Sequence, residues 1–189
     1  MVTGCGKTQT ESAASVGNKI TDTEKDAPKQ ESDSNETTER YLDELEGSTE
    51  NRNVICESQS KIDGKDFIIT LYETNDSYEI SVLGLAENEE KATILLASCN
   101  EQLAKLYDAK FCESYSVGVC LDDKMAMILV NHSGKIASGI NSDGSAVSGK
   151  LPDWIVENIT MPESESNAYN DEILNALKQF ADEMQTSLK

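Results

Sequence analysis

The sequence predicts an α+β domain in which the helices pack on one face of a mainly antiparallel sheet. Three observations indicate this fold: two groups of alternating apolar and polar residues, a helical stripe between them, and another helical stripe near the carboxy terminus. Together with a short helix they give the order βββ-α-βββ-α-α, with the strands in two three-stranded meanders. The folded part is residues 54–189, about 136 residues, a length that suits one domain with one core.

The first strand group covers residues 53–60, 66–72 and 77–83. In the second and third of these runs, apolar residues occupy every other position, as in strands with one buried face. The connections are short and polar, with Gly64 in the first and Asn75 in the second. Short polar turns between alternating runs predict antiparallel hairpins.

Two longer segments, residues 88–108 and 167–188, place apolar side chains at helical spacing on a single face. Both are predicted to be helices that pack on the sheet. The apolar face of the first carries Ala92, Leu95, Leu96, Cys99, Leu103 and Leu106, and that of the second carries Tyr169, Ile173, Leu177, Phe180, Ala181 and Met184.

The second strand group lies between these helices and covers residues 112–121, 124–131 and 135–140. The middle run is apolar on both faces, which is typical of a central strand. Residues 141–150 are polar and are predicted to be a loop. A short helix is expected to begin at Pro152, because proline is favoured in the first turn of a helix.

Residues 1–53 form a separate region in which polar and charged residues dominate. Such a segment cannot bury enough apolar surface to offset its conformational entropy, so we expect a disordered tether. Residues 38–47 differ, because Tyr41, Leu42 and Leu45 share a helical face. This stretch is either a short helix that docks on the domain or on a partner, or a transient turn within the tether.

The chain has 35 acidic and 16 basic residues and a formal charge of −19. Nucleic acid and anionic membrane surfaces should repel it, and we expect no nucleic-acid partner. Its two arginines, Arg40 and Arg52, precede the folded part, so residues 54–189 have no guanidinium to hold a phosphate through two hydrogen bonds. This composition counts against a phosphoryl-transfer enzyme and a phosphopeptide reader.

The residues Val2-Thr3-Gly4-Cys5 match the lipobox pattern of a branched apolar residue, a small residue, Gly and Cys. On these four residues and the polar tract that follows, the chain resembles a bacterial lipoprotein of the Gram-positive type. The resemblance implies a lipid anchor on Cys5 and a location on the extracytoplasmic face of the cell membrane. A secretion signal includes an apolar run of about 7–15 residues, so we expect one upstream of Val2 in the full-length gene product.

Residues that serve catalysis or metal binding are sparse. His132 is the only histidine and falls in a polar turn, where histidines are usually exposed. Cys56, Cys99, Cys112 and Cys120 lack the close spacing of zinc ligands, and we expect no metal and no cofactor. We expect these thiols to be reduced and mostly buried, as is common for a cysteine in a helix stripe. The alternative is two disulfides in an exported protein.

Two classes of function fit these observations. The first is a cell-surface lipoprotein whose acidic domain binds a protein, peptide or cell-wall ligand without catalysis. Its candidate binding residue is Trp154, because tryptophans are enriched at binding hot spots, although Trp154 also fits a core position under the short helix. The alternative is a small extracellular hydrolase that uses a pair of turn carboxylates. The candidate carboxylates are Asp122, Asp123, Asp143 and Asp153.

Overall fold

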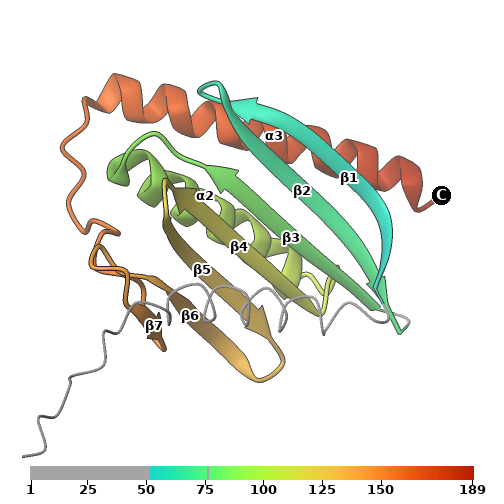
Figure 1. The fold of residues 1–189 in the computed structure, drawn as a ribbon. Helices are drawn as coiled ribbons and strands as arrows, with labels where there is room; N and C mark the ends of the chain where they lie inside the picture. Colours follow the sequence, from blue (N-terminus) through green and yellow to red (C-terminus); the bar gives the residue numbers. More distant parts are fainter. Residues whose placement is uncertain (1–51, 76) are drawn as a thin grey trace, which may run out of the picture. The chain divides into compact units, whose positions relative to one another are not determined.

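The computed structural model describes residues 52–75 and 77–189, all of which belong to one compact unit (Figure 1). Their fold is α+β, with one mixed, mostly antiparallel sheet of seven strands and two helices. The lipidation site predicted at Cys5, the predicted tether up to residue 51 and the segment 38–47 lie outside the described residues.

The seven strands follow one another across the sheet in chain order. They are β1 (Asn53–Ile62), β2 (Lys65–Thr74), β3 (Ser77–Leu85), β4 (Ser114–Leu121), β5 (Lys124–Asn131), β6 (Gly134–Ile140) and β7 (Ala146–Ser148). The helices are α2 (Glu89–Asp108) and α3 (Glu163–Ser187). Neighbouring strands are antiparallel except β3 and β4, which are parallel because α2 returns the chain to the end of the sheet where β3 begins.

Local sequence explains several of these boundaries. The turn between β1 and β2 uses Asp63 and Gly64, with φ of 50° and 73°, the left-handed conformations of a tight hairpin turn. Asn88 caps α2, because its side-chain oxygen accepts a hydrogen bond from the Lys91 N–H at 2.9 Å. The predicted strand groups and both long helices are therefore present, and the parallel β3–β4 pair joins the two groups into one sheet.

The prediction of a short helix at Pro152 is wrong, and the chain forms a turn there. Tertiary hydrogen bonds hold this segment in place, and one of them takes the Val156 N–H, which in a helix would donate to the Pro152 carbonyl oxygen. The Asp153 N–H donates to Asn141 Oδ1 at 3.1 Å, and the Val156 N–H donates to Thr93 Oγ1 at 3.1 Å. These contacts fix the segment between the end of β6 and α2, so it cannot wind into a helix.

Two further boundaries differ from the prediction. Residues 141–150 were expected to be a loop, but β7 pairs with β6 within this stretch and buries Val147. The helix predicted from residue 167 begins at Glu163, where acidic residues in the first turn interact favourably with the helix dipole. Residues 163–166 are all polar, so the apolar stripe that predicted the helix does not extend into this first turn.

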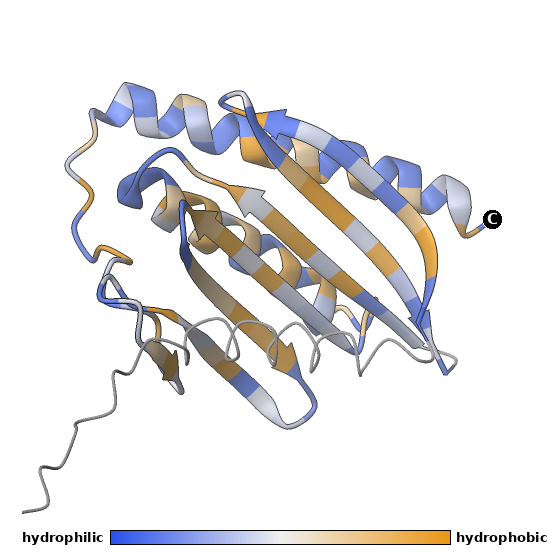
Figure 2. Ribbon diagram, in the orientation of Figure 1, coloured by the Kyte–Doolittle hydropathy of each residue, from blue (hydrophilic) through white to orange (hydrophobic). Residues whose placement is uncertain are grey.

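Both helices pack on the same face of the sheet (Figure 1). α2 lies on β3, β4 and β5, α3 lies on β1 and β2, and the two helices contact each other. Apolar and polar residues alternate along the strands, as Figure 2 shows, and the core forms between this face and the helices. The opposite face carries no helix among the described residues, and we call it the open face.

Candidate functional site

Trp154, the predicted binding residue, lies in the core, where it is 2% exposed. Its indole Nε1–H donates to the Ile140 carbonyl oxygen at 2.7 Å, and the Lys124 Nζ lies 5.9 Å from the ring centroid. The indole is thus held at the end of β6 by packing and a hydrogen bond. Because it is buried, Trp154 presents no contact surface to a partner in this structure.

The acids considered for a hydrolase site all lie in exposed turns: Asp122, Asp123, Asp143 and Asp153. The Asp143 carboxylate accepts hydrogen bonds from the Ser145 hydroxyl at 2.5 Å and the Ser145 N–H at 2.9 Å. These bonds lower the pKa of Asp143. Asp153 accepts from the Ser142 N–H at 2.9 Å. A glycosidase acid requires a raised pKa, so Asp143 is unsuited to that role.

The remaining predicted residues do not assemble into a reactive cluster. His132 is exposed in the β5–β6 turn. Cys56, Cys99, Cys112 and Cys120 are free cysteines, and burial raises the pKa of Cys99 to about 12 and that of Cys112 to about 11. Buried thiols with such pKa values stay protonated and are poor nucleophiles. Within residues 52–75 and 77–189, no three Asp, Glu, Cys or His side chains gather as metal ligands.

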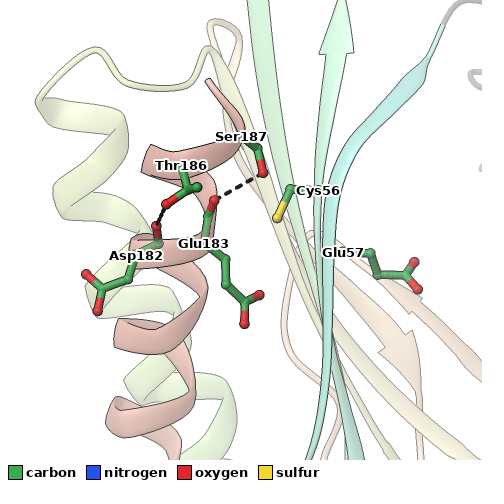
Figure 3. Close-up of a pocket in the computed structure, with 6 residues that line it drawn as sticks. All are labelled: Cys56, Glu57, Asp182, Glu183, Thr186 and Ser187. Atoms are coloured by element: carbon green, nitrogen blue, oxygen red, sulfur yellow. Dashed lines mark hydrogen bonds between the residues drawn. The ribbon is translucent and has the colours of Figure 1, made fainter. Parts of the chain in front are cut away.

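A groove of about 590 Å³ runs between β1 and the carboxy-terminal turns of α3 (Figure 3). It is open to solvent along its length and is not an enclosed pocket. Two of its lining residues come from the strand and four from the helix. They are Cys56, Glu57, Asp182, Glu183, Thr186 and Ser187.

Cys56 and Glu57 show that this groove follows the edge of the strand. Successive side chains of a strand point to opposite faces, and in Figure 3 the Cys56 thiol points toward α3 while the Glu57 carboxylate points away from it. Since both residues line the hollow although their side chains point to opposite sides, we infer that the hollow runs along the backbone edge of β1 between them. Among the described residues β1 pairs only with β2, so the backbone groups on its outer side face this groove.

The groove is acidic. Three of its six lining residues are acids, with the Glu183 carboxylate on the side of β1 and those of Asp182 and Glu57 pointing outward (Figure 3), and the last turn of α3 contains no basic residue to offset the negative end of the helix dipole. The hydroxyls of Thr186 and Ser187 donate to the backbone carbonyl oxygens of Asp182 and Glu183, at 3.0 and 3.1 Å. They therefore leave the carboxylate charges uncompensated. The arrangement can attract a cationic ligand and can pair with an extended backbone.

One feature of the sequence points to this groove, the acidic residues near the end of α3. Asp182 and Glu183 lie in the last turns of a helix, where Lys and Arg are the favoured residues, so acids there are unexpected. The position of β1 at the sheet edge was not available from its residues, because strand order depends on the whole fold.

Comparison with known proteins gives no family assignment, since no protein-family model and no curated protein sequence matches the chain. Neither described helix is both long and apolar enough to cross a membrane. The function proposed below therefore rests on the geometry and charge of the groove and on the lipobox resemblance.

Proposed function

We propose that this protein is a lipid-anchored cell-surface protein whose domain binds an extended, positively charged peptide segment without catalysis. The ligand would add to the sheet as a further strand beside β1. The observation that carries this proposal is the groove that follows the outer edge of β1, which pairs with no second strand among the described residues, and that has three acids among its lining residues. A protein or peptide ligand can satisfy both features at once, because it supplies a backbone and basic side chains.

The backbone of the ligand would supply most of the affinity. Main-chain hydrogen bonds to a free edge strand are a recurring mode of peptide recognition, in which pockets on either side select the side chains. β1 offers ten residues, Asn53–Ile62, for this pairing. Its register shifts between Val54 and Cys56, and such a bulge disrupts pairing locally. We therefore place the added strand along the part of β1 that follows the bulge.

The side chains of the ligand would supply the selectivity. Alternate residues of an added strand point to opposite faces, so one set lies on the side of Asp182 and Glu183 and the other on the side of Glu57. Lys or Arg in either set would meet a carboxylate. Because these acids are at the surface, each pair contributes about 0.2–1 kcal/mol and weakens as salt is added.

The lipobox resemblance supports a location of this domain outside the cell as part of the proposal. Cys5 would carry the lipid, and the residues between Cys5 and β1 would connect the anchor to the domain. The ligand would then be a cell-surface or secreted protein, or a peptide exposed at the cell wall. Radiolabelled palmitate fed to the native host should label the protein, and Cys5→Ser should abolish that labelling. An unlabelled protein that stays inside the cell would contradict the anchoring half of the proposal.

The groove can be tested with a displayed library of random peptides selected at low salt. We expect selected peptides to be enriched in Lys and Arg. Asp182→Asn with Glu183→Gln should weaken their binding about three- to tenfold, as expected for loss of two surface ion pairs. The control is Glu157→Gln with Asp171→Asn, which changes the net charge equally at exposed positions outside the groove. An equal loss in both double variants would show that only overall charge matters.

Backbone pairing has its own test in peptides that are N-methylated at alternate residues. Methylation removes the N–H donors of one register, and in a strand only every other N–H points at the neighbouring strand. One methylated register should therefore lose binding and the other should keep it. Equal binding of both registers would rule out strand addition while leaving a purely electrostatic contact.

A further inference from the structure

Part of the open face, on strands β2 to β6, carries a group of apolar side chains that no described element covers. The position of Gly84 shows which residues of β3 point to the open face. A Cβ on Gly84 would lie 2.7 Å from Leu95 Cδ1 of α2, so this position faces the helices. Its neighbours Leu83 and Leu85 therefore point to the open face, where they are 42% and 38% exposed. A Cβ on Gly118 would lie 3.2 Å from Leu83 Cδ1, so Leu83 lies against bare backbone.

The strand register extends this surface across the sheet. Leu83 is paired with Ile68 on one side and Gly118 on the other, and Gly118 is paired with Met127. Ile136, on β6, belongs to the same face and is 45% exposed. The apolar group of the open face consists of Ile68, Leu83, Leu85, Met125, Met127, Leu129 and Ile136, and Val54 lies apart from it at the start of β1. A contiguous apolar surface of this kind normally has an occupant.

Arg52 shows that the chain enters the domain beside this face. Its guanidinium contacts the Glu79 carboxylate at 3.1 Å and lies 5.6 Å from the centroid of the Tyr72 ring. By the strand register, Tyr72 and Glu79 are paired with each other and share the open face with Ser81 and Leu83. The side chain of Arg52 thus reaches from the start of β1 across β2 to β3, on the open face.

An apolar segment of the same chain lies within reach of this point. Tyr41, Leu42 and Leu45 share one helical face in residues 38–47, and only four residues separate Gly47 from Arg52. The five peptide links from Gly47 to Arg52 span up to about 17 Å, and strands are about 4.8 Å apart, so Gly47 can reach the middle strands at the level of Arg52, from where the residues before it can extend along the strands toward Leu83. Ten residues in a helix would span about 15 Å, roughly three strand spacings.

We propose that residues 38–47 dock on the open face, with Tyr41, Leu42 and Leu45 against Leu83 and its apolar neighbours. The short connection gives the segment an effective concentration in the millimolar range, so weak intrinsic affinity is sufficient. A second copy of the chain would have to bring together two chains that each carry a formal net charge of −19 and repel each other. The chain thus covers its own apolar face. This inference is independent of the proposed groove, which lies along the outer edge of β1.

Cys120 provides a probe for this contact. It is paired with Leu85 and Met125 on the open face, and burial raises its pKa. Replacing Cys5 and Cys56 with Ser would leave Cys120 as the only partly exposed thiol of the described domain, since Cys99 and Cys112 are 0% and 3% exposed. The rate at which a maleimide modifies Cys120 in the full chain then measures how often the face is uncovered.

The test compares two double variants. One carries both Leu42→Ser and Leu45→Ser, and the control carries both Asp43→Asn and Glu46→Gln, which lie in the same segment outside its apolar stripe. The leucine variant should react about tenfold faster at Cys120, the factor given by about 1.4 kcal/mol of docking, and the control should match the parent chain. Unchanged Trp154 fluorescence in both variants shows that the domain is folded. Equal rates in all three chains would overturn the proposal. So would a parent rate that falls as protein concentration rises, because a second copy would then be the occupant.

Discussion

The Lys91 Nζ lies 2.6 Å from the Asp63 carboxylate, and this ion pair joins the start of α2 to the turn between β1 and β2. The same ammonium lies 3.0 Å from Glu87 and 3.8 Å from Glu165 in the first turn of α3. It also lies 5.9 Å from the ring centroid of Tyr169, an attractive cation–π geometry. One largely buried cation therefore holds together the hairpin and both helices.

Replacing Lys91 with Met should destabilise the domain by about 1–2 kcal/mol, because it removes hydrogen bonds between charged groups. The variant also leaves several carboxylates near one another without their shared cation. The change is measured as a lower urea midpoint with an unchanged slope. The matched control is Lys105→Met, since Lys105 is 60% exposed in its pair with Glu101 and should cost less than about 0.5 kcal/mol. Equal losses would show that the Lys91 contacts add nothing specific.

The same pair predicts a dependence of stability on pH. The hydrogen bond from Lys91 lowers the pKa of Asp63 below 3.8, so the stabilisation is present above pH 3.8 and is lost as pH falls through the lowered pKa. Hydrogen bonds to Asp63 and Glu87 raise the pKa of Lys91 above 10.5, so its contribution is complete below pH 10.5 and is lost as pH rises through the raised pKa.

Asp63→Asn isolates the acid limb of this dependence. Asn tolerates the left-handed backbone at φ 50°, so the turn should remain intact while the charge is lost. The difference in unfolding free energy between wild type and variant should be constant near neutral pH and should shrink below pH 3.8, where wild-type Asp63 becomes protonated. A difference that stays constant down to pH 2 would mean that the carboxylate charge plays no part.

Gly139→Ala should destabilise the domain by about 2–3 kcal/mol or prevent folding, because the new methyl overpacks a site with no room to move. Its Cβ would collide with the Met125 carbonyl oxygen and lie 2.5 Å from Pro152 Cγ. Gly118→Ala, on β4, is the matched control, since its Cβ would meet the flexible end of Leu83 at 3.2 Å and the Val82 carbonyl oxygen at an ordinary 3.8 Å, and it should cost less than about 1 kcal/mol. Thermal unfolding of both variants checks this order, and a tolerated Gly139→Ala would contradict the packing of Pro152 under β6.

Trp154 fluorescence separates the two interpretations of this residue. Because the ring is 2% exposed, emission from the folded protein should be blue-shifted and protected from acrylamide, and unfolding should shift it to longer wavelength. Trp154→Phe should cost about 1–2 kcal/mol, since the Ile140 carbonyl oxygen loses its donor. Red-shifted, easily quenched emission from the folded chain would place the tryptophan at the surface instead.

Much of this fold could be predicted from local patterns, for reasons visible in particular elements. The strands β2 and β3 alternate because one face is buried, and Gly64 marks the turn before β2. The stripe of α2 is complete because the helix packs on three strands. By contrast, the segment after Pro152 was misassigned because its backbone conformation is set by hydrogen bonds to distant residues, Asn141 and Thr93.

The candidate site was harder to predict, because it depends on which elements are neighbours. Glu57 and Asp182 are far apart in sequence and line one groove only because β1 is an edge strand next to α3. Trp154 was selected by residue type, which does not report burial. The outer edge of β1, which no other described strand covers, can be identified only when the order of the seven strands is known.

Hydrogen exchange of the β1 backbone, with and without a bound basic peptide, tests strand addition most directly. We expect amides of β1 on its outer side to exchange more slowly when the peptide binds, while amides of β7, at the opposite edge of the described sheet, are unchanged. Peptide binding that leaves β1 exchange unaltered, or that protects β7 instead, would contradict the account.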